Sequence, residues 1–133
     1  MKYLLDTNVV SDYLRGTESV VKKVQNAKPS DLTISAVTVM ELRYGAARRQ
    51  SAKLTAAVEA FISGVTVVAF DAEAGEQAGL LRAAVESKGI AIALPDCQIA
   101  ATAQVMGLTL VSNDANLKRM PKLKVQDWRG KKG

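Results

Sequence analysis

The chain opens with Met1-Lys-Tyr-Leu-Leu-Asp-Thr-Asn8, and this stretch decides how the rest of the sequence is interpreted. Residues 3–5 form an apolar run that is too short for a helix, so they predict a buried strand. Asp6 follows directly, where the strand gives way to a turn. In open parallel α/β sheets, ligands bind just beyond the carboxyl ends of the strands. Asp6 is therefore a candidate metal ligand or catalytic acid, although aspartate at such a position also commonly caps the next helix.

The composition limits the chemistry that is open to this chain. Its 133 residues fit one domain, spanning residues 1–133, with a proper hydrophobic core. There is no histidine and a single cysteine, Cys97, which excludes Ser-His-Asp and Cys-His nucleophilic schemes and zinc sites built on imidazole or thiolate. An enzyme of this composition must use carboxylates, amides, hydroxyls, lysines and arginines. Carboxylate oxygens select hard cations, here Mg²⁺ or Mn²⁺.

Charge and hydropathy indicate the kind of partner and location. The net charge of +5, with a pI near 9.5, favours a polyanionic partner such as nucleic acid or an acidic protein. No stretch approaches the roughly 20 apolar residues that are needed to span a bilayer, so we expect no membrane association. A lone cysteine cannot form an internal disulfide, which agrees with a reducing, cytoplasmic location.

The apolar periodicity predicts strands and helices in alternation. Strands are expected at residues 3–5, 32–34, 65–70 and 108–111, with a short edge strand at 123–125; helices are expected at 9–15, 18–26, 35–49, 50–64, 71–88 and 99–106. Such alternation predicts an α/β fold, a three-layer α/β/α sandwich around a central parallel sheet of four to five strands. We expect a flexible basic tail from about residue 129 to residue 133.

Glu41 is the second candidate acid and lies in the helix expected at 35–49. The apolar face of that helix is expected to carry residues that recur at spacings of three and four, namely Val37, Met40, Tyr44 and Ala47. Glu41 falls on the same side, where an acidic residue is costly unless it is paired or bound to a metal. Alternatively, Glu41 closes a capping box with Thr38, because Thr-x-x-Glu fits that pattern.

Two further aspartates occupy comparable positions. Asp96 stands in the first turn of the helix before the fourth strand, and small alanines let that helix approach the sheet closely. Asp114 follows the fourth strand after Ser112 and Asn113, which repeats the pattern seen at Asp6. The structural alternatives are an N-terminal helix cap for Asp96 and a turn aspartate for Asp114.

The four acids together favour a shared site. With right-handed crossovers, the strand ends and helix starts that carry them can meet at one edge of a parallel sheet. Carboxylates packed together repel one another unless they are protonated or neutralised by a cation. Divalent metals in carboxylate sites activate water for attack on phosphodiesters. Since the chain is also basic, nucleic acid is the substrate class that this constellation predicts.

Several stretches combine into a specific pattern in a fixed order: Leu4-Leu-Asp-Thr-Asn8, Ile34-Ser-Ala-Val-Thr-Val-Met-Glu-Leu-Arg-Tyr-Gly-Ala46, Asp96-Cys-Gln-Ile-Ala-Ala101, Leu110-Val-Ser-Asn-Asp114 and Val125-Gln-Asp-Trp128. Over nearly the whole chain, this set resembles the PIN-domain ribonucleases, and specifically the VapC toxins of bacterial toxin–antitoxin pairs. The chain departs from the family after the fourth acidic position. Members often have an acidic–aromatic pair there, whereas this chain has Ala115-Asn-Leu-Lys118, so Asn113 and Asn116 are further candidates to share the role of Asp114.

The resemblance implies a PIN-like fold and assigns roles to residues of this chain. It implies Asp6, Glu41, Asp96 and Asp114 as an acidic site for Mg²⁺ or Mn²⁺, Thr7 and Ser112 as supporting hydroxyls, and Asn8 as a group that holds Asp6 in place. It also implies an endoribonuclease that inhibits translation by cutting a folded RNA. The folded RNA that the resemblance favours is a transfer RNA. The implied partners are a second copy of the chain and a VapB-type antitoxin, whose tail blocks the site within a larger complex.

Basic residues supply candidate contacts to the RNA backbone, which would make affinity salt-sensitive. The candidates are Arg43, Arg48, Arg49, Lys118, Arg119, Lys122 and Lys124. Any one of them can equally be a solvated surface charge.

Two other functions fit part of the pattern. A catalytically inactive PIN domain that binds RNA or protein would be expected to lack some of the acids, whereas all four are present. A phosphatase of the haloacid-dehalogenase type also begins with a strand that ends in aspartate. Its chemistry needs a second acid two residues later, where this chain has Asn8.

Overall fold

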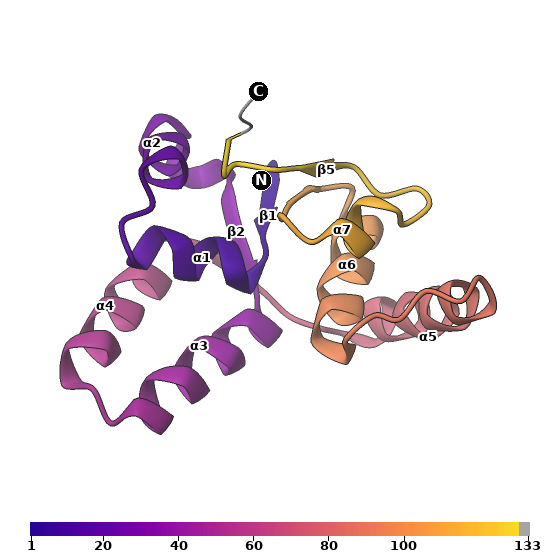
Figure 1. Ribbon diagram of the computed structural model, residues 1–133, viewed down its shortest axis with the longest axis horizontal. Helices are drawn as coiled ribbons and strands as arrows, with labels where there is room; N and C mark the ends of the chain where they lie inside the picture. Colours follow the sequence, from indigo (N-terminus) through magenta and orange to yellow (C-terminus); the bar gives the residue numbers. More distant parts are fainter. Residues whose placement is uncertain (131–133) are drawn as a thin grey trace.

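The computed structural model describes residues 1–130, which form a parallel sheet covered by helices on both faces (Figure 1). The strands of this part of the chain are β1 (Tyr3–Leu5), β2 (Leu32–Ser35), β3 (Thr66–Val68), β4 (Thr109–Val111) and β5 (Val125–Gln126), in the order β3-β2-β1-β4-β5. Every neighbouring pair is parallel. The predicted α/β fold with a central parallel sheet is confirmed.

The helices divide between the two faces of the sheet. They are α1 (Thr7–Leu14), α2 (Glu18–Asn26), α3 (Ala36–Arg49), α4 (Ala52–Ser63), α5 (Ala72–Ser87), α6 (Leu94–Met106) and α7 (Ala115–Lys118), with a 3₁₀ turn, η1 (Pro29–Asp31), before β2. In Figure 1, α1 to α4 lie on one side of the sheet, and α5 to α7 lie on the other. None of the helices within residues 1–130 is long and apolar enough to cross a membrane.

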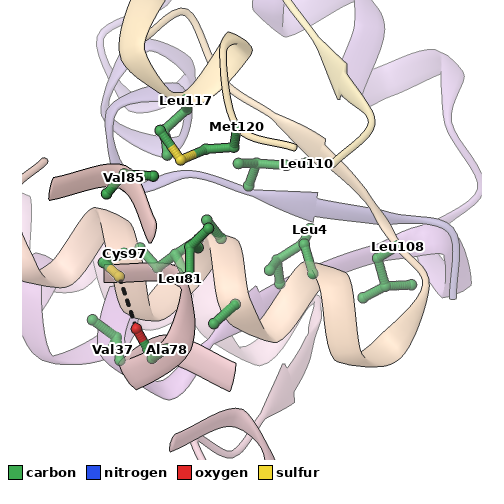
Figure 2. Close-up of a cluster of buried hydrophobic side chains, with 14 of the residues drawn as sticks. Leu4, Val37, Ala78, Leu81, Val85, Cys97, Leu108, Leu110, Leu117 and Met120 are labelled. Carbon is green, nitrogen blue, oxygen red and sulfur yellow. Dashed lines mark hydrogen bonds between the residues drawn. The ribbon is translucent and has the colours of Figure 1, made fainter. Parts of the chain in front are cut away.

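Alternation along the strands separates two apolar cores. Leu4 and Leu110 point into the core under α5, α6 and α7, which includes Leu117 and Met120 (Figure 2). Their neighbours along the strands, Leu5 and Val111, point into the other core, under α1 to α4. Consecutive residues of a strand point to opposite faces of the sheet, so each of these short strands contributes side chains to both cores.

The strand order places a topological switch point beside β1. The chain proceeds from β1 to β2 on one side, whereas β4 pairs with β1 on the other, so the strand order reverses between β1 and β4. The register places Leu5 opposite Val111, and each strand ends at that residue. The residues that follow these two strands therefore meet at the switch point, where α/β sheets bind their ligands.

Some sequence-based boundaries and faces need correction. α6 begins at Leu94 instead of residue 99, and α7 lies in a region where no helix was expected. The predicted inward face of α3 is wrong, because Met40 is 55% exposed and Tyr44 is 61% exposed. The helix instead buries the side chains Val37, Thr38, Leu42 and Ala46. Of the predicted stripe, only Val37 is buried, and Ala47 is exposed as well.

The C-terminal segment is more fixed than the sequence predicts. Arg129, assigned to a flexible tail, makes side-chain hydrogen bonds to Asp12, and its carbonyl oxygen accepts one from the Ser19 hydroxyl at 2.6 Å. The rest of that expected tail, residues 131–133, lies outside the described part of the chain.

Candidate functional site

Asp6 directly follows the end of β1 and caps the helix that begins there. It is the N-cap of α1, and its Oδ1 accepts a hydrogen bond from the Thr7 amide at 2.8 Å. Its Oδ2 accepts one from the Ser112 hydroxyl at 2.8 Å, while the Asp6 amide donates to the Val111 carbonyl at 2.9 Å. The residue is only 1% exposed. Capping therefore uses one carboxylate oxygen and does not remove Asp6 from the site.

The environment of Asp6 disfavours its charge. Burial raises the pKa of Asp6 above its ordinary value. The hydrogen bonds from Ser112 and Thr7 lower this pKa, whereas the charges of Glu41 and Asp114 raise it further. No ion pair among the described residues involves Asp6. The carboxylate thus lies buried among neutral donors and other acids.

Glu41 is brought to the same place by Thr7. The Thr7 hydroxyl donates to Glu41 Oε1 at 2.6 Å, and its oxygen lies 3.0 Å from the Thr38 hydroxyl. The capping-box interpretation of Thr38 and Glu41 is wrong, because Ser35 is the N-cap of α3 and its hydroxyl accepts from the Val37 amide. Thr7 therefore joins two of the candidate acids, holding Asp6 through its amide and Glu41 through its hydroxyl.

Asp96 is the least constrained of the four acids. It lies in the first turn of α6, but the N-cap is Ala93 and makes no side-chain cap, so the capping interpretation of Asp96 is wrong. Within residues 1–130 its partly buried carboxylate makes no hydrogen bond or ion pair. Burial raises the pKa of Asp96 to about 6, and the charges of Asp6, Asp114 and Glu41 contribute to the same shift. These effects place Asp96 within electrostatic reach of the other three acids.

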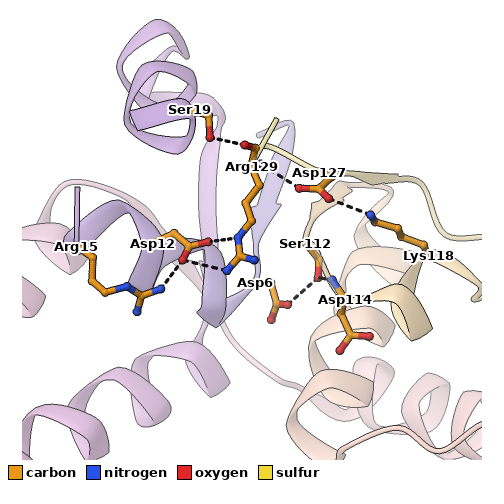
Figure 3. A network of polar contacts seen from close by, with 9 residues as sticks. All are labelled: Asp6, Asp12, Arg15, Ser19, Ser112, Asp114, Lys118, Asp127 and Arg129. Atoms are coloured by element: carbon orange, nitrogen blue, oxygen red, sulfur yellow. Dashed lines mark hydrogen bonds and ion pairs between the residues drawn. The ribbon is translucent and has the colours of Figure 1, made fainter. Parts of the chain in front are cut away.

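Asp114 is held by the same serine as Asp6. Its amide donates to the Ser112 hydroxyl oxygen at 3.0 Å (Figure 3). Asp114 also has the turn role that was the alternative, because it is the N-cap of α7 and its Oδ1 accepts from the amides of Asn116 and Leu117. Its Oδ2 remains for another role. Ser112, fully buried, thus connects the ends of β1 and β4.

The three asparagines differ in their relation to the acids. Asn8 is exposed and makes no hydrogen bond to Asp6, so the expectation that it holds Asp6 is wrong; Thr7 and Ser112 do so. The side-chain amide of Asn116 donates to the Ala91 carbonyl at 3.0 Å and is committed to the loop before α6. The side-chain nitrogen of Asn113 is buried without a partner among the described residues.

The donor set fits the chemistry of a hard divalent cation. It consists of carboxylate and hydroxyl oxygens, and none of the four acids is paired with a cationic side chain within residues 1–130. Their mutual repulsion is what a bound cation would relieve. In the described arrangement, however, no group of three or more acidic or cysteine side chains is placed so that it could hold a metal ion.

A cavity of about 170 Å³ between α1, α3 and α4 adjoins Glu41. Thr7 and Glu41 line it together with Arg15 and Arg49, and its walls are otherwise largely apolar. Arg49, a predicted RNA contact, thus shares a cavity with one of the four acids. Arg43 instead pairs with Glu59, and Lys118 pairs with Asp127 at 2.9 Å. Arg48 and Arg119 are exposed.

Sequence reasoning missed a second buried acid, Asp12. The residue is 1% exposed, and its carboxylate binds two guanidinium groups, those of Arg15 and Arg129 (Figure 3). The spacing of three between Asp12 and Arg15 was a signal for one of these pairs. No local signal pointed to Arg129, which is 117 residues away in the sequence.

A parallel sheet with acids grouped at its switch point defines a class of protein, and the comparisons agree with it. Residues 3–123 match the family model described as the PIN domain, so the chain belongs to the PIN-domain family. It is 32% identical to the "tRNA(fMet)-specific endonuclease VapC" of Salmonella typhimurium over 130 residues, which cover 96% of this chain and 98% of that protein.

Solved structures show the same likeness. The VapBC complex of Salmonella typhimurium bound to DNA contains a chain that matches with a TM-score of 0.87 and 33% identity, covering 96% of this chain and 98% of the other. The VapBC2 complex of Rickettsia felis, bound to a DNA fragment from the promoter, contains a chain that matches with a TM-score of 0.84 and 28% identity, covering 96% and 99%. The resemblance seen in the sequence is confirmed over nearly the full length.

Proposed function

We propose that this chain is the toxin of a toxin–antitoxin pair and a divalent-metal-dependent endoribonuclease that hydrolyses phosphodiester bonds of RNA. The observation that carries the proposal is the group of four acids at the switch point of a PIN-domain sheet, which lack cationic partners within residues 1–130. A transfer RNA is the first substrate to test, because the similar Salmonella typhimurium protein is named for tRNA(fMet).

Four side chains of this chain are assigned to the metal. Asp6, Glu41, Asp96 and Asp114 would hold Mg²⁺ or Mn²⁺, directly or through water. The bound ion would lower the pKa of the attacking water and offset charge on the phosphate. This assignment agrees with the raised pKa values of Asp6 and Asp96, because a nearby cation favours the charged form of both.

The neutral groups of the site position these acids. Ser112 donates to Asp6 and accepts from the Asp114 amide, which fixes the two N-caps relative to each other. Thr7 donates to Glu41 and, through its amide, to Asp6. Because Asp6, Glu41 and Asp114 are each oriented by hydrogen bonds before any ion binds, less ordering is left to occur on binding.

The alternative is a catalytically inactive PIN domain that binds RNA or protein. A binding module has no use for a set of buried or partly buried acids that repel one another and the phosphate backbone. The four acids thus favour catalysis over simple binding.

The decisive experiment is cleavage of bulk transfer RNA by the purified, antitoxin-free protein. Wild type is incubated with Mg²⁺ or Mn²⁺ and with chelator, beside Asp6→Asn. We expect discrete fragments only from wild type with metal. If the metal-loaded protein cleaves no RNA, the proposed nuclease function is wrong and the binding module takes its place.

A matched control separates the metal role of Asp6 from its capping role. Asp71 is the N-cap of α5 and accepts a hydrogen bond from the Ala74 amide at 3.0 Å, so Asp71→Asn perturbs a helix cap away from the acids. We expect Asp71→Asn to cleave like wild type. A thermal-shift titration gives a second readout, since added Mn²⁺ should raise the Tm of wild type and of Asp71→Asn but not of Asp6→Asn.

We also propose two protein partners. Because the similar solved structures are VapBC complexes, a VapB-type antitoxin is the expected inhibitor of this chain. A second copy of the chain is the other partner, and the exposed Met40 and Tyr44 of α3 supply an apolar surface for it. Light scattering of wild type and Tyr44→Glu tests the dimer, which the charged variant should weaken.

A further inference from the structure

The proposed chemistry does not use the buried carboxylate of Asp12. Asp12 lies on α1, six residues after Asp6, and both are 1% exposed. Six residues of α-helix advance by about 9 Å, so Asp12 is near the acidic site without belonging to it. None of the pKa effects on Asp6 or Asp96 involves Asp12.

Asp12 holds two arginines that come from different parts of the chain. Arg129 Nε donates to Asp12 Oδ2 at 2.9 Å, and its Nη2 donates to Oδ1 at 3.3 Å. Arg15 Nη2 donates to the same Oδ1. In Figure 3 the two guanidinium groups approach Asp12 from opposite sides, and that of Arg129 lies between Asp12 and Asp6 in this view. A planar guanidinium bound to a carboxylate in this way keeps a defined orientation.

Both arginines remain available to solvent. The side chain of Arg15 is 65% exposed and that of Arg129 is 51% exposed, in contrast to the 2% of Asp12. Each guanidinium has five N–H donors, and within residues 1–130 the bonds to Asp12 occupy one donor nitrogen of Arg15 and two of Arg129. One carboxylate against two guanidiniums leaves a net charge of +1.

The position of this cluster relates it to the acids. Arg15 lines the same cavity as Thr7 and Glu41, so it shares that cavity with one of the four acids. Arg129 is fixed from its backbone side as well, because its amide donates to Asp127 Oδ1 at 2.9 Å and its carbonyl accepts from Ser19. Two oriented cations are therefore held beside Asp12, on the helix whose N-cap is Asp6.

We propose that Asp12 holds Arg15 and Arg129 as a preformed pair of phosphate-binding side chains, which contact the RNA backbone next to the phosphodiester that is cut. This inference rests on the proposed ribonuclease function and deepens it. Guanidinium groups suit phosphate because their donors match two of its oxygens. The acids alone would repel RNA, and the cations bound to Asp12, about 9 Å further along α1, would offset part of that repulsion.

The test measures binding of labelled bulk transfer RNA at several salt concentrations. An Asp6→Asn background prevents cleavage, and Arg15→Gln and Arg129→Gln are added one at a time. Each should weaken binding about three- to tenfold at low salt and make the slope of log K against log salt less steep by about 0.7 to 0.9. The control is Arg82→Gln on α5, where Arg82 is 58% exposed and pairs only with Glu86 in the adjacent helical turn. It should leave the slope unchanged.

Asp12→Asn tests the holding role by the sign of its effect. Removing a negative charge strengthens RNA binding if only net charge matters. If Asp12 orients the arginines, the same variant weakens binding although the protein becomes more positive. Arg129→Lys is the companion variant for the case that Asp12→Asn does not fold. Lysine keeps the positive charge but lacks the paired N–H donors of the guanidinium. The RNA affinity of this variant should therefore fall between those of wild type and Arg129→Gln.

Cleavage kinetics, measured on variants that keep Asp6 intact, complete the test. Arg15→Gln and Arg129→Gln should raise KM several-fold and change kcat by less than about twofold, because they act on binding away from the reacting atoms. Unchanged salt slopes and KM, with a lower Tm, would overturn the inference and leave a structural ion pair. Failure of wild type to cleave any RNA would instead overturn the proposed function, which the salt slopes do not measure.

Discussion

Two aspartates of α1, Asp6 and Asp12, are buried to the same degree and surrounded in opposite ways. Both are 1% exposed. Asp6 accepts hydrogen bonds from an amide and a hydroxyl and faces other acids, and its pKa is raised, chiefly by burial. Asp12 binds two guanidinium groups, and the bond it accepts raises the pKa of Arg129. One helix thus carries a carboxylate that lacks a cation and a carboxylate that has two.

The comparison shows that the surroundings of a buried acid, more than its burial, indicate its use. A carboxylate that is neutralised by the protein's own cations is complete in the folded chain. A carboxylate left among neutral donors and other acids is stable only with a proton or an added cation. The four predictions below test this distinction, in order of decreasing effect.

The largest effect is expected from Asp6→Asn on activity. Loss of the carboxylate should lower kcat/KM for RNA cleavage by at least about 100-fold, because charge stabilisation at the phosphate depends on the bound cation. The Tm in chelator should not fall, since an amide can keep the bond to Ser112 and removes a buried charge. A variant that unfolds in parallel with its loss of activity would contradict the distinction from Asp12.

The next largest effect is expected from Ser112→Ala, which removes the hydroxyl shared by Asp6 and Asp114. We expect kcat/KM to fall about 10- to 100-fold, as is usual when a group that orients metal ligands is lost. Mn²⁺ affinity, measured by calorimetry, should fall in proportion. Thr102→Ala is the control, because Thr102 is equally buried but bonds only to the Gln98 carbonyl of its own helix. Equal losses in both variants would mean that general destabilisation is responsible.

Asp12→Asn should act mainly on stability. We expect the free energy of unfolding in urea to fall by about 1–3 kcal/mol, because bonds to charged groups at a buried site are lost. Glu59→Gln is the comparison, since it breaks the exposed pair with Arg43 and should change stability much less. If the two variants are equally stable, Asp12 does not fix α1 to the C-terminal segment.

The smallest effect is the pH dependence of stability without metal. The pKa of Asp96 is raised from 3.8 to about 6 in the folded chain, so between these values the folded state binds more protons than the unfolded state. The stability linked to this residue is therefore fully present below pH 4 and is lost as the pH rises through about 6. Asp96→Asn, measured in chelator, should gain in Tm over wild type at pH 7 and not at pH 4. A difference that is constant across this range would contradict the shift.

Much of the site was predictable because strand ends are visible in the sequence. An apolar run followed abruptly by an aspartate marks both Asp6 and Asp114, and parallel topology brings such positions to one edge. Glu41 was predicted partly for a wrong reason. Its helix buries Leu42 and Ala46 instead of Met40 and Tyr44, and Glu41 reaches the site at the margin of that stripe.

The roles of the supporting residues were less predictable. Ser112 and Thr7 took part as expected, whereas Asn8, two residues after Asp6, is exposed. Thr7 and Asn8 point in different directions because successive side chains in the first turn of a helix lie about 100° apart. Only the packing of α1 against α3 decides that Thr7 faces Glu41.

The sequence by itself determined the alternation of strands and helices, the acids at the strand ends and the membership of the PIN-domain family, because these depend on local patterns and on their order along the chain. The tertiary structure alone decided which face α3 buries, that Thr7 joins Asp6 to Glu41, and that Asp12 binds Arg129 across 117 residues. Contacts of this kind arise when separate elements pack, and side-chain orientation within the packed fold has no local signature in the sequence.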